Sequence, residues 1–371
     1  MANVYIKTKI LSGDSAIKYL KEIRSKTIFI VCDKFISESG TIKYITNALD
    51  LTNSVEVFDR AIPDPTTEVV GKGLNMIYKV KPDIVIGFGG GSAIDTAKGI
   101  IYFANLKKGI KKPEFITVPT TSGTGSEVTS VAVITDLENK SKHLIASDEI
   151  LADVALVDPQ LTLSVPQSIT ANTGMDVFTH ALEAYVSKDA NVFSDALAEK
   201  SIELLLNSLL TCYKEGKNLV ARTMMHEAST LAGIAFNTAG LGVNHSIAHQ
   251  LGGTFHIPHG LANAILLNEV IEYNCVNHDI MLKYASLAYK VQLVSIDETP
   301  EFAVKVLKEI INTLMRCMNM PLNIRGIGID IEEYKHHIQR MSDTALLDNC
   351  LNTTPRKIGA AGIQKILCSI Y

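Results

Sequence analysis

Four histidines lie within one short stretch, VNHSIAHQLGGTFHIPHG (residues 243–260), although the whole protein contains only ten. Several imidazoles close together are typical of metal sites and proton-transfer sites, whereas a single histidine in an apolar stretch is usually a satisfied core residue. His245 and His249 are four residues apart, so their side chains project from the same face of a helix. The stretch indicates metal or proton chemistry without choosing between them.

Further along this stretch, Gly252, Gly253 and Pro258 are expected to break the helix. The chain is then expected to turn back toward this helix, so that His259 approaches the first two histidines from a separate loop.

An acidic partner lies upstream in TANTGMDVFTHALEAY (residues 170–185), where Asp176 and His180 are also four residues apart. Their neighbours along the expected helix are largely apolar, which favours a buried pair that needs a strong partner over a surface pair. One carboxylate and three imidazoles suit Fe(II) or Zn(II), with one position left open for a substrate. The spacing leaves open which three histidines coordinate the metal.

A second candidate site follows the buried strand predicted at DIVIGFGG (residues 83–90). The glycines at 89–91 lead into a helix that opens at Ser92, and backbone amides at such a helix start can bind a pyrophosphate. The spacing does not complete the GxGxxG pattern, so a plain tight turn is the alternative. Asp95 lies in the first turn of that helix, where an acid also stabilises the helix dipole.

Two further segments suit a bound dinucleotide. A predicted strand ends at Asp33, in IFIVCDKF. A carboxylate there can accept hydrogen bonds from an adenosine ribose and would repel a 2'-phosphate, so it favours NAD over NADP. An acid in a simple turn is the alternative for Asp33. The loop PTTSGTGSEVTS (residues 119–130) is rich in hydroxyls and small residues, which suits the close approach of a backbone to a ligand.

The elements that must position these residues change character along the chain. Strand-like runs alternate with amphipathic helical segments such as 68–81 and 93–108, which predicts a parallel, doubly wound sheet. The runs are residues 26–33, 53–59, 83–90, 114–120 and 155–159. Residues 128–147 differ, because two short strands flank a polar turn and predict a β-hairpin.

Helical periodicity replaces the strand pattern after about residue 160, for example in residues 194–216 and 299–318. We therefore predict an α/β, Rossmann-like dinucleotide-binding domain at residues 1–162. An all-α metal-binding and substrate domain follows at residues 163–371.

Composition excludes several classes of protein. The 371 residues carry a net charge of −4, which gives no reason to expect nucleic acid or an anionic membrane as a partner. The sequence shows neither an apolar run as long as a membrane span nor a secretory signal. Six scattered cysteines without a CxxC pair are typical of buried thiols in a reducing cytoplasm. We therefore expect a cytoplasmic protein.

Taken together, these motifs resemble those of the iron-containing, or group III, alcohol dehydrogenases. The resemblance covers essentially the whole chain and is carried by GGGSAIDTAK, PTTSGTGSEVT, TANTGMDVFTHALEAYVS and NHSIAHQLGGTFHIPHGLANA. Within the family, ITANTGMDV, DALAEK, STLAGIAF and LGGTFHIPHGLANA are most similar to the 1-propanol dehydrogenases of bacterial microcompartments that degrade 1,2-propanediol.

The resemblance implies roles for individual residues. It implies a metal held by Asp176, His180, His245 and His259. His249 is then a catalytic residue that relays protons, while His256 matches no ligand and is expected to line the cleft or pack there. Asp95 is expected to lie beside the nicotinamide and its ribose, with a catalytic role. Cofactor contacts are implied for Asp33, Gly89, Gly90, Gly91, Ser92, Asp95, Thr120, Thr121, Thr124, Thr129, Val133 and Lys142.

One position departs from the family pattern. Asp64, in PDPT, stands where many members have an asparagine that approaches the cofactor. The resemblance therefore does not imply this contact.

The activity that the resemblance implies is a metal-dependent, NAD(H)-linked alcohol dehydrogenase or aldehyde reductase. It would interconvert a short-chain primary alcohol, such as propanol, ethanol or butanol, and its aldehyde in a cleft between the two domains. Fe(II) is the expected ion, and Zn(II) accepts the same ligands.

Two alternatives differ in class. A polyol or lactaldehyde-type dehydrogenase could use the same scaffold, although the apolar run around Phe255, Ile257 and Leu261 argues against a polyol pocket. A non-catalytic, cofactor-binding structural protein is the other alternative. The family also implies a homodimer or larger homo-oligomer, and microcompartment components are candidate partners. An edge strand near the N-terminus is our own candidate for pairing with a second subunit.

Overall fold

The structure is a computed structural model that describes residues 4–107, 111–137 and 141–371, without the side chains of residues 141 and 142. The chain divides into two compact units, one formed by Tyr5–Ser164 and the other built on Val165–Tyr371. The first unit contains all of the strands in the described residues, and the second is helical. This arrangement confirms the predicted fold class, an α/β domain followed by an all-α domain.

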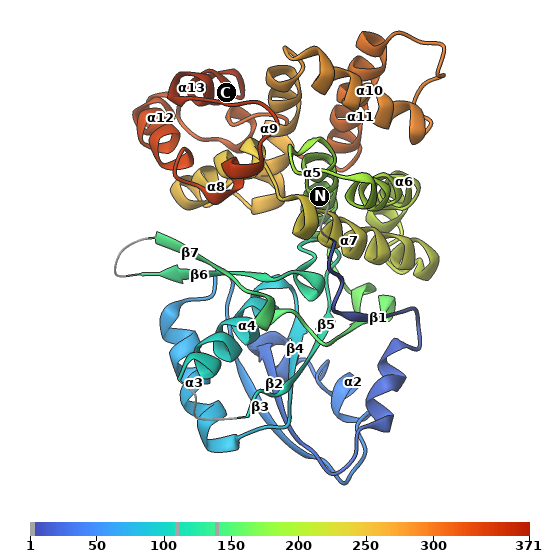
Figure 1. The fold of residues 1–371 in the computed structure, drawn as a ribbon, viewed down its shortest axis with the longest axis vertical. Helices are drawn as coiled ribbons and strands as arrows, with labels where there is room; N and C mark the ends of the chain where they lie inside the picture. The colour runs from blue at the N-terminus through green and yellow to red at the C-terminus, as the bar shows by residue number, and fades with distance from the viewer. Residues whose placement is uncertain (1–3, 108–110, 138–140) are drawn as a thin grey trace. The chain divides into compact units, whose positions relative to one another are not determined.

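A six-stranded sheet forms the centre of the first unit (Figure 1), and all of its ladders are parallel. From one edge to the other the strands are β1 (Lys9–Ser12), β8 (Val154–Val157), β5 (Glu114–Pro119), β4 (Ile84–Gly89), β2 (Thr27–Asp33) and β3 (Ser54–Ala61). Every residue of β4 and β8 is buried, as expected for strands that are covered on both faces. Of these strands, β1 was expected only as an edge strand, and the other five were predicted from their β-branched runs.

Helices cover both faces of this sheet. Alternate residues of β2 point to opposite faces, so Phe29 and Val31 enter one core while Ile28 and Ile30 enter the other. The first core contains α3 (Thr67–Val80) and α4 (Gly91–Leu106). The second contains η1 (Ala16–Glu22), α1 (Lys34–Glu38), α2 (Lys43–Thr46) and η4 (Pro159–Thr162). Two short turns of 3-10 helix complete the unit, η2 (Ser126–Val128) and η3 (Asp148–Ile150).

The predicted hairpin is confirmed. Strands β6 (Val131–Asp136) and β7 (Ser141–Ala146) pair antiparallel, with Val131 opposite Ala146 and Asp136 opposite Ser141. Residues 138–140 of the predicted turn lie outside the described residues.

Helices alone build the described part of the second unit (Figure 1). They are α5 (Gln167–Val186), α6 (Val192–Lys214), α7 (Leu219–Ala239), α8 (Val243–Phe255), α9 (His259–Asn274), α10 (His278–Lys290), α11 (Pro300–Cys317), η5 (Arg325–Ile327), α12 (Ile331–Ala345), η6 (Asn349–Thr353) and α13 (Ala360–Ser369). α5 packs against α6, α7 and α9, and its second half is buried on all sides. Polar side chains on that half must therefore find partners inside the protein.

The histidine-rich stretch folds differently from our expectation. Gly252 and Gly253 do not break the helix, because α8 continues through both of them to Phe255. It ends at His256, which adopts the left-handed conformation with φ 55° and caps the helix. The expectation that His259 belongs to a separate loop was also wrong, since it is the first residue of α9.

The cysteines are all free thiols, so the expectation of no disulfide framework holds. Cys32 and Cys212 are buried as expected, whereas Cys317 and Cys368 are exposed, so the expectation of buried thiols was wrong for those two. No helix among the described residues has the length and apolar character needed to cross a membrane.

Candidate metal centre and dinucleotide-binding turn

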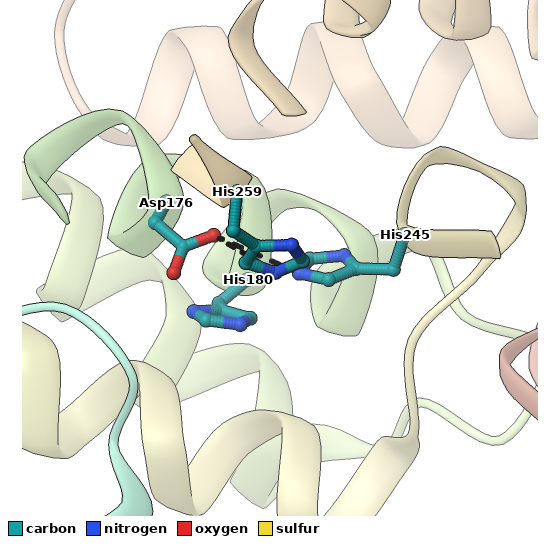
Figure 2. A group of neighbouring side chains, drawn as sticks. All are labelled: Asp176, His180, His245 and His259. Carbon is teal, nitrogen blue, oxygen red and sulfur yellow. Dashed lines mark ion pairs between the residues drawn. The ribbon is translucent and has the colours of Figure 1, made fainter. Parts of the chain in front are cut away.

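Three helices of the second unit bring one carboxylate and three imidazoles together (Figure 2). Asp176 and His180 lie one turn apart on α5, His245 lies on α8, and His259 opens α9. One potential ligand atom from each of the four lies within 4.8 Å of those of the other three. The Asp176 Oδ1 atom is 3.5 Å from His259 Nε2 and 3.9 Å from His245 Nε2.

The electrostatics of this cluster favour a deprotonated Asp176 and a neutral His245. Burial alone would raise the pKa of Asp176, but the neighbouring imidazoles and the Asn263 amide outweigh it, and the pKa of this carboxyl lies below its usual value. Burial, followed by the nearby His180 and His259 rings, holds the pKa of His245 well below its usual value. These are the protonation states that metal ligands require.

A divalent transition metal fits this donor set. Carboxylate oxygen and imidazole nitrogen are ligands that Fe(II) and Zn(II) both accept. The Nδ1 atom of His180 is also buried, and it has no hydrogen-bond partner within the described residues. A bound cation would satisfy a ring nitrogen of this kind, because a buried polar atom without a partner is otherwise costly.

A layer of polar side chains supports the four residues. Glu183 Oε2 lies 2.6 Å from His245 Nδ1, on the side of the ring away from Asp176. The Asn263 amide nitrogen donates to Asp176 Oδ1 over 2.8 Å, and Asn244 donates to the Asn263 side-chain oxygen over 2.9 Å. Burial raises the pKa of Glu183 to about 7, although several backbone N–H groups that donate to it work in the opposite direction.

Sequence reasoning missed this supporting layer. Helical spacing could have revealed part of it, because Asn263 lies four residues after His259 and Glu183 continues the buried face of α5. Asn244 adjoins a histidine that had been singled out. By contrast, nothing local in the sequence pointed to Asp348.

Asp348 is the partner of His249. Its Oδ2 atom lies 2.7 Å from His249 Nδ1, while its Oδ1 atom accepts a hydrogen bond from the backbone of Cys350. Burial works against the charged form of Asp348, but the hydrogen bond and charge of His249 lower the pKa of this carboxyl to about 2. The His249 ring stacks on the His259 ring at 5.4 Å between centroids, so it lies beside the four candidate ligands. His256, in contrast, is exposed at the end of α8.

In the first unit, the glycine turn joins β4 to α4. Gly89 has φ +147°, a conformation that L side chains rarely adopt, and Gly90 is the N-cap of α4. A Cβ on Gly91 would lie 2.6 Å from Thr124 Cγ2, so the turn is in close contact with the loop at 119–130. Gly90, as the N-cap, has no side chain to cap the first N–H groups of α4, which is the kind of helix start that binds anions.

The threonines predicted to contact a cofactor divide between two settings. Thr120 donates its backbone N–H to the Gly89 carbonyl, and Thr121 Oγ1 lies 3.3 Å from the Cβ position of Gly90, so both lie at the turn. Thr129, in contrast, is buried. Its hydroxyl accepts a hydrogen bond from Lys98 Nζ over 3.1 Å.

Asp95 ties the same loop and the hairpin to α4. Ser126 Oγ donates to Asp95 Oδ1 over 2.6 Å, and the Val133 N–H donates to Asp95 Oδ2 over 3.0 Å. Burial raises the pKa of Asp95, while the nearby Lys98 partly offsets this effect. Burial lowers the pKa of Lys98 itself to about 8. Sequence reasoning did not single out Lys98, which reads as an ordinary helix residue.

The structure also places the remaining predicted cofactor residues. Asp33 is the N-cap of α1, and its Oδ1 atom accepts the Ile36 N–H over 2.9 Å, as an acid in a turn would do. Asp64 adopts the left-handed conformation with φ 51°, a region that asparagine and aspartate favour. The backbone of Lys142 pairs with Thr135 in the hairpin, and its side chain lies outside the described residues.

Known families match almost the whole chain. Residues 7–159 match the family described as iron-containing alcohol dehydrogenase, and residues 170–371 match the C-terminal part of the Fe-containing alcohol dehydrogenase family. The chain is 42% identical to the 1-propanol dehydrogenase PduQ of Citrobacter freundii over 367 residues, with 99% of each protein covered. It is also 42% identical to the protein of the same name from Salmonella typhimurium, with 98% of each covered.

A solved structure agrees with these matches. The crystal structure of a 1,3-propanediol oxidoreductase superposes with a TM-score of 0.91 at 33% sequence identity, and the superposition covers 100% of both chains. The chain therefore belongs to the iron-containing alcohol dehydrogenase family, is similar over nearly its whole length to 1-propanol dehydrogenases, and is a metal-dependent alcohol dehydrogenase.

Proposed function

We propose that the protein interconverts short-chain primary alcohols, propanol above all, and their aldehydes, with NAD(H) as the hydride carrier. The observation that carries the proposal is the convergence of Asp176, His180, His245 and His259, which we propose hold Fe(II). Similarity to 1-propanol dehydrogenases supports a three-carbon substrate, and ethanol and butanol are the neighbouring candidates. Zn(II) is the alternative ion for the same donors.

Asp176, His180, His245 and His259 would hold a metal that would supply Lewis acidity toward the substrate oxygen, and the turn at the start of α4 would hold a nicotinamide cofactor that would supply or accept the hydride. His249 moves the proton that accompanies this hydride. Because the Asp348 carboxylate holds Nδ1 at 2.7 Å, Nε2 is the ring atom free to give a proton to the alcohol oxygen or to take it. In aldehyde reduction one hydride and one proton thus convert the carbonyl to a hydroxyl.

We propose that the cofactor binds at the turn at the start of α4. The pyrophosphate would accept hydrogen bonds from the uncapped N–H groups around Gly90, Gly91 and Ser92. Asp33 caps α1 through Oδ1, which leaves Oδ2 to accept from the adenosine ribose. Asp95 keeps its proposed place beside the nicotinamide ribose, although both of its oxygens also accept hydrogen bonds from the protein. The other proposed cofactor contacts are Gly89, Thr120, Thr121, Thr124, Thr129, Val133 and Lys142.

A polyol or lactaldehyde-type substrate is the competing proposal. Phe255 is half-buried and packs against Tyr334 with 5.7 Å between ring centroids, while Ile257 and Leu261 are buried, so these three side chains offer apolar contacts and no hydrogen-bonding groups for a polyol. A substrate panel must decide between the two.

The test is anaerobic reconstitution with Fe(II), followed by NADH oxidation with propanal, acetaldehyde, butanal, lactaldehyde, 3-hydroxypropanal and dihydroxyacetone. We expect propanal to give the highest kcat/KM. Higher kcat/KM with the hydroxylated carbonyls would favour the competing substrate class. No turnover with any short aldehyde would contradict the dehydrogenase proposal.

Variants divide the histidines by role. His245→Ala and His259→Ala should lose bound iron, measured by elemental analysis. His249→Ala should keep the iron and lose rate, since its ring moves protons and does not hold the metal. Loss of iron in all three variants would contradict this division.

The cellular setting is part of the proposal. Similarity to PduQ proteins supports a role in propanediol degradation, in the cytoplasm and there within a bacterial microcompartment, where microcompartment components would be partners. We also propose a homodimer or larger homo-oligomer, because β1 pairs only with β8 and leaves its other edge open within the described sheet. Fractionation of cells grown on 1,2-propanediol and light scattering of the purified protein test these two points.

A further inference from the structure

Glu183 lies on α5 three residues after His180, and it is not one of the four clustered ligands. Its carboxylate is buried and reaches across to the start of α8. There Oε1 accepts the Asn244 N–H over 2.7 Å, and Oε2 lies 3.4 Å from the His245 backbone nitrogen and 2.6 Å from the His245 Nδ1 atom. The Gly242 N–H also donates to this carboxylate.

This geometry determines the direction of the short hydrogen bond to the ring. Both oxygens of Glu183 already face backbone N–H groups, and an N–H can only donate. The carboxylate is therefore the acceptor toward the ring as well, and Nδ1 of His245 carries the proton. The proton-free nitrogen is then Nε2, the atom that faces Asp176 within the ligand cluster.

We infer that Glu183 is a positioning residue that makes His245 competent as a metal ligand, by fixing its tautomer and holding its ring against the start of α8. The inference rests on the proposed metal site. Carboxylates that accept from the far nitrogen of a ligating histidine orient the ring and make it more basic, and their loss usually weakens metal binding by about 10- to 100-fold.

The alternative role for Glu183 is purely structural, as a cap for the start of α8, and Glu183→Gln separates the two roles. An amide offers one acceptor oxygen and one NH2 group. Three backbone N–H groups compete for the oxygen, so the NH2 group is left facing Nδ1 of His245. Nδ1 must then accept, the proton moves to Nε2, and the nitrogen that should bind the metal is blocked while the helix cap survives.

A substitution at Gly242 tests the same carboxylate in a second way. A Cβ at this position would lie 2.8 Å from Glu183 Oε1, closer than real Cβ contacts allow, so Gly242→Ala displaces the carboxylate without removing it. Gly253→Ala is the matched control, because Gly253 lies on α8, the helix that Gly242 precedes as N-cap, and an added Cβ there would have no heavy atom within 4 Å.

The experiment uses the full chain, stripped of metal, with Zn(II) and then anaerobic Fe(II) as probes. A competing chromogenic chelator reports the metal Kd, and circular dichroism reports the fold. We expect Glu183→Gln to weaken binding by about 10- to 100-fold with its helix content retained, Gly242→Ala by about 10-fold, and Glu183→Asp less than Glu183→Gln. Gly253→Ala should bind as the wild type does.

Wild-type affinity in Glu183→Gln would overturn the inference and leave only the capping role. If Glu183→Gln fails to fold, Gly242→Ala decides, and unchanged affinity there overturns the inference equally. These outcomes are independent of the proposed activity. A wild-type protein that binds metal tightly and reduces no short aldehyde would contradict the proposed function and leave the role of Glu183 intact.

Discussion

Gly260 controls where His259 lies, because it allows the first turn of α9 to approach the backbone of α5. A Cβ added to Gly260 would overlap the carbonyl oxygen of Asn172 and lie 2.6 Å from the carbonyl carbon of the same residue. Asn172 lies one helical turn before Asp176 on α5. Both obstructing atoms belong to the backbone of a packed helix, so neither can rotate away.

The Gly260→Ala substitution must therefore move α9 away from α5. Carbon atoms pack at roughly 3.5–4.0 Å, so the Asn172 carbonyl carbon would have to lie about 1 Å farther away. Metal–ligand distances tolerate changes of only about 0.2 Å, which means that His259 would leave the ligand set. We expect the affinity for Zn(II) to fall by about 100-fold or more. The free energy of unfolding of the metal-free protein should fall by about 1–3 kcal/mol, the usual cost of overpacking.

Chelator competition measures the affinity, and urea unfolding of the metal-free protein measures the stability. Gly253→Ala serves again as the control, since an alanine in that helix has space and should raise the free energy of unfolding by about 0.5–1 kcal/mol without changing metal affinity. A folded Gly260→Ala protein that binds Zn(II) as tightly as the wild type would refute the reasoning.

Three further predictions concern the cofactor, the buried lysine and the metal. Asp33→Ser keeps an oxygen to cap α1 and removes the negative charge of the side chain. The ratio of kcat/KM for NADPH to kcat/KM for NADH should therefore rise by about 10-fold or more. An unchanged ratio would count against the ribose contact. Burial lowers the pKa of Lys98 to about 8, so the unfolded chain binds more protons than the folded protein between pH 8 and the ordinary lysine value. Wild-type stability should therefore rise by about 3 kcal/mol relative to Lys98→Met between pH 7 and pH 10.5, measured by urea unfolding, and a constant difference would show that Lys98 titrates normally. Removal of the metal with a chelator should lower the melting temperature, and Fe(II) or Zn(II) should restore it; an unchanged melting temperature would mean that the ion does not bind the folded state preferentially.

Much of the first unit could be predicted because its central strands are buried on both faces. Such strands are continuous runs of β-branched residues, and β4 followed by glycines is the clearest of them. β1, with the sequence KILS, is short and half exposed at an edge, so its composition carries little signal. It was predicted only as an edge strand.

The helix that carries His245 and His249 shows where local rules fail. Two adjacent glycines each lower helix stability by about 1 kcal/mol, which led us to expect a break. Tertiary packing outweighs this cost, because Leu251 and Ile247 bury their side chains and hold α8 in place. The helix ends instead at His256, whose backbone adopts the left-handed conformation. The residue type alone does not predict that conformation.

Part of the site was accessible to sequence reasoning because Asp176 with His180, and His245 with His249, are spaced pairs on single helices. The choice of ligands among the histidines rested on the family resemblance. The supporting acids were not accessible, since a hydrogen bond between residues distant in sequence leaves no local pattern. His249 and Asp348 are separated by 99 positions along the chain, and only the packed fold brings them together.

The pairing of β1 with β8 has a consequence for how the protein is made. Lys9 lies opposite Val154 and Ser12 opposite Val157, so the first strand of the unit pairs with the last. During synthesis β1 therefore has no strand to pair with until almost the entire first unit has left the ribosome. By then β2 can already have paired with β3 and β4. β1 is the last strand of the sheet that can pair, so its backbone N–H and C=O groups have no partner strand until β8 has been synthesised.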